Sequence, residues 1–293
     1  LALMLSATFA YAAARVEKLA GNLYAYVSDN DHSSNSTFLV GRDSILVVDT
    51  GLNAAEGQKL LAEIRKISPL PIAFIVNTHY HPDHQGGNGV VGPHAVVISS
   101  PFTRERTLQL IEQQQKQQQQ PSPAPAAAAP PRPSFMAAKE TVGQKLTIYM
   151  DGDPVEIIAA GPAHTMGDVY VYFPAQQTIA TGDLFMNNSC PAMDQGDAAN
   201  WVHALDLMAG LKVEHFVPGH FDVATQAGFL QFRDYLADLD GQVEKLFRAG
   251  VSAEDIAGHL EMSRYQSFRQ FPQFHATFAD NAATIYRQLK QRQ

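Results

Sequence analysis

The sequence has 293 residues, of which 45% are hydrophobic and 17% are charged, and its formal net charge is −8. A chain of this length and composition can bury a large core, so we expect an ordered protein. The acidic balance disfavours binding to nucleic-acid backbones, which requires clustered Lys and Arg. Cys190 is the only cysteine, which excludes an intramolecular disulfide and a cysteine-rich zinc cluster.

The first 14 residues, LALMLSATFAYAAA, form an apolar run that ends in small residues with an Ala-x-Ala pattern. This pattern is typical of the apolar region and cleavage site of a secretory signal. The run is too short to span a bilayer, which needs ~20 apolar residues. We therefore expect residues 1–14 to be a signal peptide remnant and the protein to be periplasmic or secreted. An ordinary amphipathic N-terminal segment is the alternative.

The following part of the chain alternates between strands and helices. Apolar runs separated by polar turns predict strands at residues 23–27, 36–40 and 44–49. Apolar residues at helical spacing predict a helix at residues 56–67, and the next apolar run predicts a strand at residues 72–76. This alternation indicates an α/β or α+β fold.

Residues 78–87, THYHPDHQGG, follow the last of these strands and contain three histidines and an aspartate within six positions. Imidazole and carboxylate groups are ligands that divalent metals prefer. Because side chains alternate in an extended segment, His79 and His81 can converge on one ion. Asp83 and His84 lie beyond a proline turn and can serve a second ion. The segment therefore predicts half of a metal site.

The middle of the chain is low in complexity. After a predicted strand at residues 95–98 and a helix at 103–112, a glutamine run and a segment rich in Pro and Ala occupy residues 113–133. Such a composition buries too little apolar surface to offset the entropy of ordering. We expect a mobile insertion near the site entrance rather than a domain boundary. A helix followed by an extended arm that binds a partner is the alternative.

The second half of the chain returns to the same alternation, so residues 15–293 are predicted to form one domain. The strands are predicted at residues 145–150, 155–159, 169–173, 178–180 and 216–217. The helices are predicted at residues 201–211, 229–249, 252–260 and 278–289, the last three within a helical C-terminal region, 229–293. We expect this region and the insertion to form the walls of the site.

Three more strand ends carry a side chain that can bind a metal. His164, Asp183 and His220 each follow an apolar run that ends in Gly or Pro. Loops at the end of a rigid scaffold can converge, so these residues can complete the site begun by residues 78–87. The other six histidines lack a second ligand at useful spacing or lie inside helical or turn segments, although His32 lies on a polar hairpin loop that can reach a substrate.

The order of these motifs, His-x-His-x-Asp-His, Ala-His-Thr, Gly-Asp and Pro-Gly-His, resembles the metallo-β-lactamase superfamily. The resemblance covers the chain from about Val16 to about Tyr235. It implies a four-layer αββα sandwich with the metals at the edge between its two sheets. It also implies seven ligands around two zinc ions: His79, His81 and His164 at the first, Asp83, His84 and His220 at the second, and Asp183 bridging both.

The same resemblance implies a hydrolase of a small activated acyl substrate, such as a β-lactam, lactone or thioester. A hydroxide held between the zinc ions would attack the substrate, and Asp83 would orient it. Asp183 is more similar to glyoxalase II than to true β-lactamases, which commonly have Cys or Ser there. Asp168, Asn187 and Asn188 are candidates to support the ligands or an oxyanion. An iron-dependent persulfide dioxygenase and a non-catalytic metal-binding periplasmic component are the alternatives.

Overall fold

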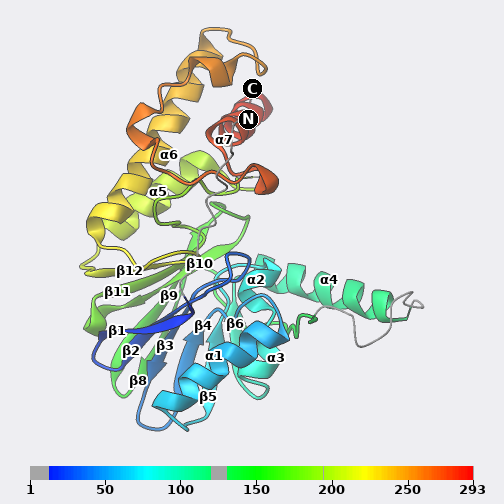
Figure 1. Ribbon diagram of the computed structural model, residues 1–293, viewed down its shortest axis with the longest axis vertical. Coiled ribbons are helices and arrows are strands. Elements are labelled where there is room, and N and C mark those ends of the chain that lie inside the picture. The colour runs from blue at the N-terminus through cyan, green and yellow to red at the C-terminus, as the bar shows by residue number, and fades with distance from the viewer. Residues whose placement is uncertain (1–12, 120–130, 194, 293) are drawn as a thin grey trace, which may run out of the picture.

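The computed structural model describes residues 13–119, 131–193 and 195–292. Two β-sheets face each other at the centre of the molecule, and helices cover the outer face of each sheet (Figure 1). The predicted four-layer αββα sandwich is therefore confirmed.

The first sheet contains seven strands that follow one another in chain order. They are β1 (Arg15–Ala20), β2 (Leu23–Val27), β3 (Ser36–Val40), β4 (Ile45–Val48), β5 (Ile72–Val76), β6 (Val96–Ser99) and β7 (Glu140–Thr141). Strands β1 to β4 pair in antiparallel fashion, and β4 to β7 are parallel. The helices of this half are α1 (Ala54–Ile67), α2 (Pro82–Gln85), α3 (Asn88–Val91) and α4 (Pro101–Gln118).

The second sheet contains five strands in the order β12-β11-β10-β9-β8. They are β8 (Lys145–Met150), β9 (Asp153–Gly161), β10 (Asp168–Phe173), β11 (Thr178–Gly182) and β12 (His215–Pro218). The helices of this half are α5 (Ala198–Ala209), α6 (Gln226–Arg248) and α7 (Phe278–Gln291), with short 3-10 turns η2 (Pro174–Gln176), η3 (Ile256–His259), η4 (Ser263–Tyr265) and η5 (Pro272–Phe274). All the predicted strands are present, whereas β1 and β7 were not predicted.

Three buried apolar clusters hold the four layers together. Because side chains alternate along a strand, successive residues of one strand belong to different clusters. In β4, Leu46 and Val48 face the other sheet, whereas Ile45 and Val47 face α1 and α3. In β10, the three apolar residues Val169, Val171 and Phe173 likewise face the first sheet, and two tyrosines face α5 and α6. A strand buried on both faces carries a nearly continuous apolar run, which explains why these strands were easy to predict.

The helix α4 is longer than predicted and continues through most of the glutamine run. Ser100 caps its start by accepting a hydrogen bond from the Thr103 N–H at 3.1 Å. Glu112 and Lys116 form an ion pair at 2.6 Å across one turn. Gln and Lys are good helix formers, so the run continues the helix as far as Gln118. Residues 113–118 are therefore helical, in agreement with the first part of the alternative, a helix followed by an extended arm. The mobility of the insertion stays a prediction, and residues 120–130 lie outside the described residues.

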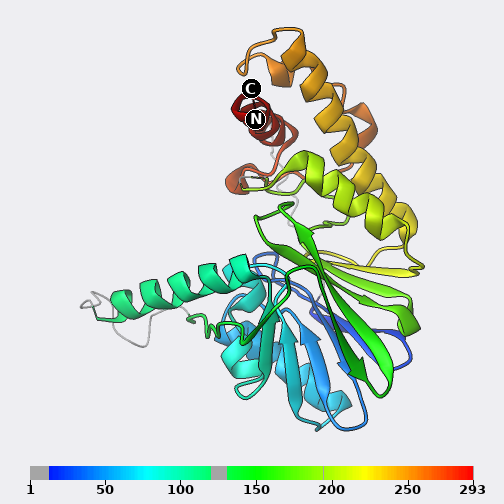
Figure 2. The same cartoon turned by 180° about the vertical axis from the view of Figure 1, so that it is seen from behind.

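Figures 1 and 2 show α4 extending away from the body of the molecule. Among the described residues, no helix is long and apolar enough to cross a membrane. The predicted signal peptide remnant falls almost wholly on residues 1–12, which lie outside the described residues.

The helix predicted at residues 252–260 is wrong, because the structure has only the 3-10 turn η3 there. Ser252 does accept a hydrogen bond from the Asp255 N–H at 3.3 Å, as the capping pattern indicated. Ile256 is the only buried residue of this segment and Leu260 is partly buried, so the segment has only a small apolar face to stabilise a longer helix.

Candidate metal centre

The predicted ligands come from both sheets and meet at one edge of the sandwich. Each lies in a loop or short helix that begins at the C-terminal end of a strand, where a rigid scaffold fixes its position. His79, His81, Asp83 and His84 follow β5, His164 follows β9, Asp183 follows β11, and His220 follows β12.

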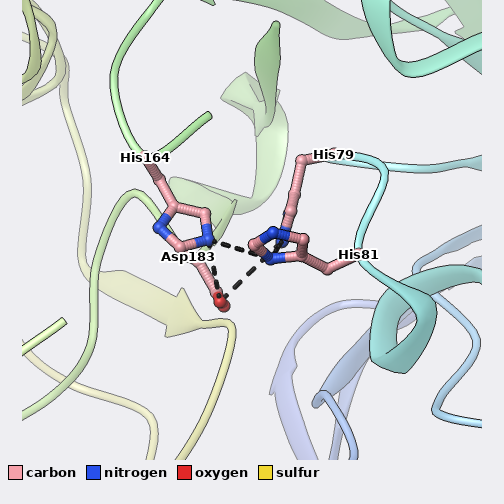
Figure 3. Close-up of side chains that lie close together, drawn as sticks. All are labelled: His79, His81, His164 and Asp183. Carbon is pink, nitrogen blue, oxygen red and sulfur yellow. Dashed lines mark hydrogen bonds and ion pairs between the residues drawn. The ribbon is translucent and has the colours of Figure 1, made fainter. Parts of the chain in front are cut away.

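The first ligand group consists of His79, His81, His164 and Asp183, whose side chains point toward one another (Figure 3). His81 Nδ1 lies 3.0 Å from His79 Nε2 and 3.2 Å from His164 Nε2. Asp183 Oδ2 lies 3.4 Å from His164 Nε2 and 3.9 Å from His79 Nε2. Three imidazole nitrogens and one carboxylate oxygen thus surround one point.

The second ligand group consists of Asp83, His84 and His220. Asp83 Oδ2 lies 3.4 Å from His84 Nε2 and 3.2 Å from His220 Nε2. The other oxygen of Asp183, Oδ1, lies 3.2 Å and 3.6 Å from the same two nitrogens. Asp183 therefore presents one oxygen to each group.

These separations fit two divalent metal ions. A tetrahedral zinc ion with bonds of ~2.0–2.1 Å separates its ligand atoms by ~3.3 Å, close to the contacts within both groups. In addition, His84 Nε2 and Asp183 Oδ1 are buried without a hydrogen-bond partner among the described residues. Buried polar atoms are rarely left unpaired, so their convergence indicates a site built for a cation.

One carboxylate that was not predicted, Asp49 at the end of β4, orients a histidine of each group. His84 Nδ1–H donates to Asp49 Oδ2 at 2.8 Å. The Thr78 hydroxyl donates to the same oxygen at 2.7 Å and lies 3.1 Å from His79 Nδ1. Both histidines thereby direct Nε2 at the cluster. The signal in the sequence was the same as for the predicted ligands, a polar residue directly after an apolar strand.

The loop that carries His164 is held by two further contacts. His164 Nδ1–H donates to the Ala192 carbonyl at 3.1 Å, which leaves Nε2 free for the cluster. The Thr165 N–H and hydroxyl donate to the Asp168 carboxylate at 2.7 and 2.6 Å. Burial raises the pKa of Asp168 to about 7 despite these bonds. Asp168 therefore supports the loop that carries His164, which agrees with its predicted role in supporting a ligand.

Two glycines are needed for the close approach of these loops. A Cβ on Gly182 would lie 2.3 Å from Thr78 Oγ1, and the φ angle of Gly182 is +52°. A Cβ on Gly219 would lie 1.9 Å from Asp183 Oδ1. Side chains at these positions would displace the residues that support or form the cluster, which explains the Gly-Asp and Pro-Gly-His patterns.

The pKa values of the histidines in the first ligand group favour metal binding. Burial lowers the pKa of His79 well below its usual value, and the neighbouring His84 and His81 lower it further. Burial also lowers the pKa of His81, and it lowers that of His164 to about 3. Since a histidine must be neutral to coordinate, these three side chains can bind a metal at neutral pH without releasing a proton.

The second ligand group holds protons more tightly. Burial lowers the pKa of His84 and His220, but the carboxylates of Asp183 and Asp83 outweigh burial and raise both values. In return, His84 lowers the pKa of Asp83 and Asp183 well below their usual range, although burial opposes this shift. A metal at the second group must displace protons from its histidines.

A cavity of about 440 Å³ opens beside the cluster. Ligands of both groups line it, and the rest of its lining is mainly apolar. These apolar lining residues are Leu52, Pro82, Met186, Ala192, Phe221, Phe271, Phe274 and Ala276. His32 also lines the cavity, as its place on a hairpin loop indicated.

The predicted walls are only partly correct. The described residues of the insertion, 113–119 and 131–133, do not line the cavity, and the C-terminal contribution comes from residues 271–276 rather than from the long helices. Asn187 donates to the Asp222 carbonyl at 3.0 Å, and Asn188 accepts from the Ser267 hydroxyl at 3.3 Å. Neither asparagine lines the cavity, so their predicted role at an oxyanion has no structural support.

Comparison with known proteins identifies the class to which this fold and site belong. The family model of the metallo-beta-lactamase superfamily matches residues 29–220, which include every predicted ligand. The chain belongs to this superfamily, and its ligand cluster is suited to divalent metal.

Its curated relatives are distant and chemically diverse. The chain is 25% identical over 183 residues to the 2,4-dinitroanisole O-demethylase subunit alpha of Nocardioides sp., covering 62% of this chain and 50% of the relative. It is 20% identical over 218 residues to the metallo-beta-lactamase type 2 of Bacteroides fragilis, covering 71% and 79%. The chain thus spans about half the length of the first of these relatives.

Solved structures share the fold at low sequence identity. A stereoselective inverting sec-alkylsulfatase from Pseudomonas sp. superposes with a TM-score of 0.71 at 18% identity, over 94% of this chain and 50% of that chain. A metallo-beta-lactamase from Pontibacter korlensis gives a TM-score of 0.60 at 20% identity, over 77% and 99%.

Proposed function

We propose that this protein is a zinc-dependent hydrolase of a small activated acyl compound, a β-lactam, lactone or thioester, and that it binds two zinc ions per chain. The observation that carries the proposal is the position of Asp183, whose two oxygens face the two ligand groups. His79, His81 and His164 would hold one ion, Asp83, His84 and His220 the other, and Asp183 would bridge them.

When bound, the ions would supply Lewis acidity and a water whose pKa falls from 15.7 to about 7. The chain itself would orient the reactants. Asp83 contacts His84 and His220 through Oδ2, and its carboxylate also lines the cavity. Asp83 Oδ1 is therefore the atom that would accept a hydrogen bond from the attacking water and hold its proton.

The first experiment is metal analysis of the purified protein together with a substrate panel. We expect about two zinc ions per chain and hydrolysis of at least one of three compounds: a chromogenic cephalosporin, a lactone or a glutathione thioester. One iron per chain would contradict the proposal and favour a persulfide dioxygenase of this fold. If the cephalosporin were not hydrolysed, only the β-lactam would be excluded as a substrate class.

A variant separates catalysis from a purely structural metal. His81→Ala removes a nitrogen common to the two shortest contacts of the first ligand group. It should abolish hydrolysis, whereas His203→Ala, at an exposed histidine on α5, should leave hydrolysis unchanged. If neither the protein nor its zinc-loaded form turned over any substrate, a non-catalytic metal-binding component would be favoured.

We also propose that the protein is exported to the periplasm or secreted. The support is the apolar run and Ala-x-Ala pattern of residues 1–14. Fusion of this segment, preceded by an initiating Met and a basic residue, to a reporter that is active only after export tests the proposal. A reporter that stays inactive would contradict it.

A further inference from the structure

The wall of the cavity away from the ligand cluster is aromatic. The Phe271 ring stacks on that of Phe221, with centroids 5.8 Å apart and planes 7° apart. Phe274 lies 6.3 Å from Phe271, and His32 meets the edge of Phe274 at 5.2 Å. These rings extend the cavity from the ligands toward the exposed Phe274, so they form a surface along which an apolar chain can lie.

This wall is anchored to the body of the protein. The Cys190 N–H donates to the Arg269 carbonyl at 2.9 Å, and the Arg269 N–H donates to the Asn188 carbonyl at 3.0 Å. Two hydrogen bonds of 3.0 and 3.2 Å close residues 271–276 into a tight loop. The aromatic residues are thus fixed beside the ligand cluster by backbone contacts.

Away from the ligand cluster, the described residues that line the cavity offer no lysine or arginine to pair with a charge at the far end of a substrate. Asp31, which also lines the cavity, adds a negative charge. The residues outside the described part contain no lysine or arginine at all.

Two cations near the aromatic wall do not line the cavity. Lys59 lines a neighbouring cavity together with Phe271, and it lies 3.3 Å from an oxygen of Asp29 and 3.2 Å from one of Glu56. The guanidinium of Arg269 lies 4.3 Å over the Phe221 ring. Burying an unpaired carboxylate against such a wall is costly, whereas burying an alkyl chain is favourable.

We propose, on the basis of the hydrolase function above, that the substrate is an acyl compound whose chain is apolar and uncharged at its far end and lies along Phe221, Phe271 and Phe274. In the reaction, water adds to the carbonyl, the bond to the leaving group breaks, and the leaving group departs with a proton. Cephalosporins and glutathione thioesters carry carboxylates away from the reacting bond, so the cavity favours simple lactones and acyl esters over both.

The test compares two esters of equal length and equal leaving group on the zinc-loaded full chain. One is 4-nitrophenyl octanoate, and the other is the mono-4-nitrophenyl ester of octanedioic acid, which ends in a carboxylate. We expect kcat/KM to be at least about tenfold higher for the octanoate, and to rise about two- to fourfold per methylene from the acetate upward. An equal or higher value for the carboxylate ester, or for the ester of 8-aminooctanoic acid, would overturn the proposal.

Variants locate the preference in the aromatic wall. Phe274→Ala should reduce the ratio of kcat/KM for octanoate over acetate, and Phe274→Lys should raise activity on the carboxylate ester relative to the octanoate. Tyr149→Ala, at an exposed aromatic residue of β8 that does not line the cavity, should leave both ratios unchanged. If Phe274→Lys gave no such shift, the wall would not set specificity.

A binding measurement keeps this proposal separate from the hydrolase function. Calorimetry on the metal-free protein compares octanamide with the monoamide of octanedioic acid. Tighter binding of octanamide would support the proposal that the substrate chain is uncharged, even if no ester were hydrolysed. A lack of ester hydrolysis would overturn only the hydrolase function. Tighter binding of the charged amide would overturn the inference about the wall.

Discussion

The two ligand groups share Asp183 but differ in how they hold protons. The first group has three histidines with lowered pKa values, because burial disfavours their charged forms. The second group has two histidines with raised pKa values, because two carboxylates face them. Neighbouring sites built from the same side chains can therefore differ in pH dependence through the number of carboxylates that face their histidines.

The largest effect is expected from removing the residue that the two groups share. Asp183→Ala takes one oxygen from each group and should lower both metal content and kcat/KM. Because changing a residue that only supports a ligand costs ~10–100-fold, we expect a loss of more than about a hundredfold. Metal analysis after dialysis and steady-state kinetics measure it, with Asp43→Ala, at an exposed turn, as the control. Retention of two tightly held metals would show that Asp183 does not bridge.

The next largest effect is expected at Asp49, which supports a histidine of each group but is not itself a predicted ligand. Asp49→Asn removes the charge that orients His84 directly and His79 through Thr78. Metal affinity should fall about 10–100-fold at both groups. Competition with a fluorescent chelator measures it. A loss of affinity confined to the metal of the second group would show that Asp49 acts only through its hydrogen bond to His84.

Lowering the pH should weaken metal binding at the second group more than at the first. Because their pKa values are raised, His84 and His220 take up protons at higher pH than a free imidazole does, so protons compete with metal binding there as the pH falls from 8 to 6. Affinity should fall by about tenfold per pH unit for each displaced proton. The lowered pKa values of the first group leave its histidines neutral over this range. Metal content should therefore fall from two ions to one, and simultaneous loss of both ions would contradict the assignment.

The smallest effect concerns the support of His164. In the metal-free chain, Asp168 has a pKa raised from 3.8 to about 7, so between these values the folded chain holds a proton that the unfolded chain has lost. The free energy of unfolding should fall as the pH rises through this window, by about 1.4 kcal/mol or less per pH unit. Asp168→Asn should flatten this dependence in urea titrations. If the pH dependence of the free energy of unfolding were unchanged in this variant, a titrating group other than Asp168 would cause it.

The ligand cluster was predictable because each ligand is marked locally. His79, His164 and Asp183 all follow an apolar strand, and a strand end fixes its next residues at the edge of a sheet. The elements that the sequence did not predict have little local signal. The two-residue strand β7 is exposed, and the turn at Ile256 has a capping pattern but only a small apolar face.

The strands and most of the helices could be predicted from the sequence, and the resemblance of its motifs to a known family implied the four layers and the set of ligands. Buried strands and amphipathic helices carry their own periodicity, and metal ligands occur at short, fixed spacings. Three features are visible only in the folded chain: Asp183 divides its oxygens between the two groups, Asp49 orients two histidines, and Phe271 and Phe274 form the wall. These features join residues far apart in the chain, and the packing of two sheets sets their distances.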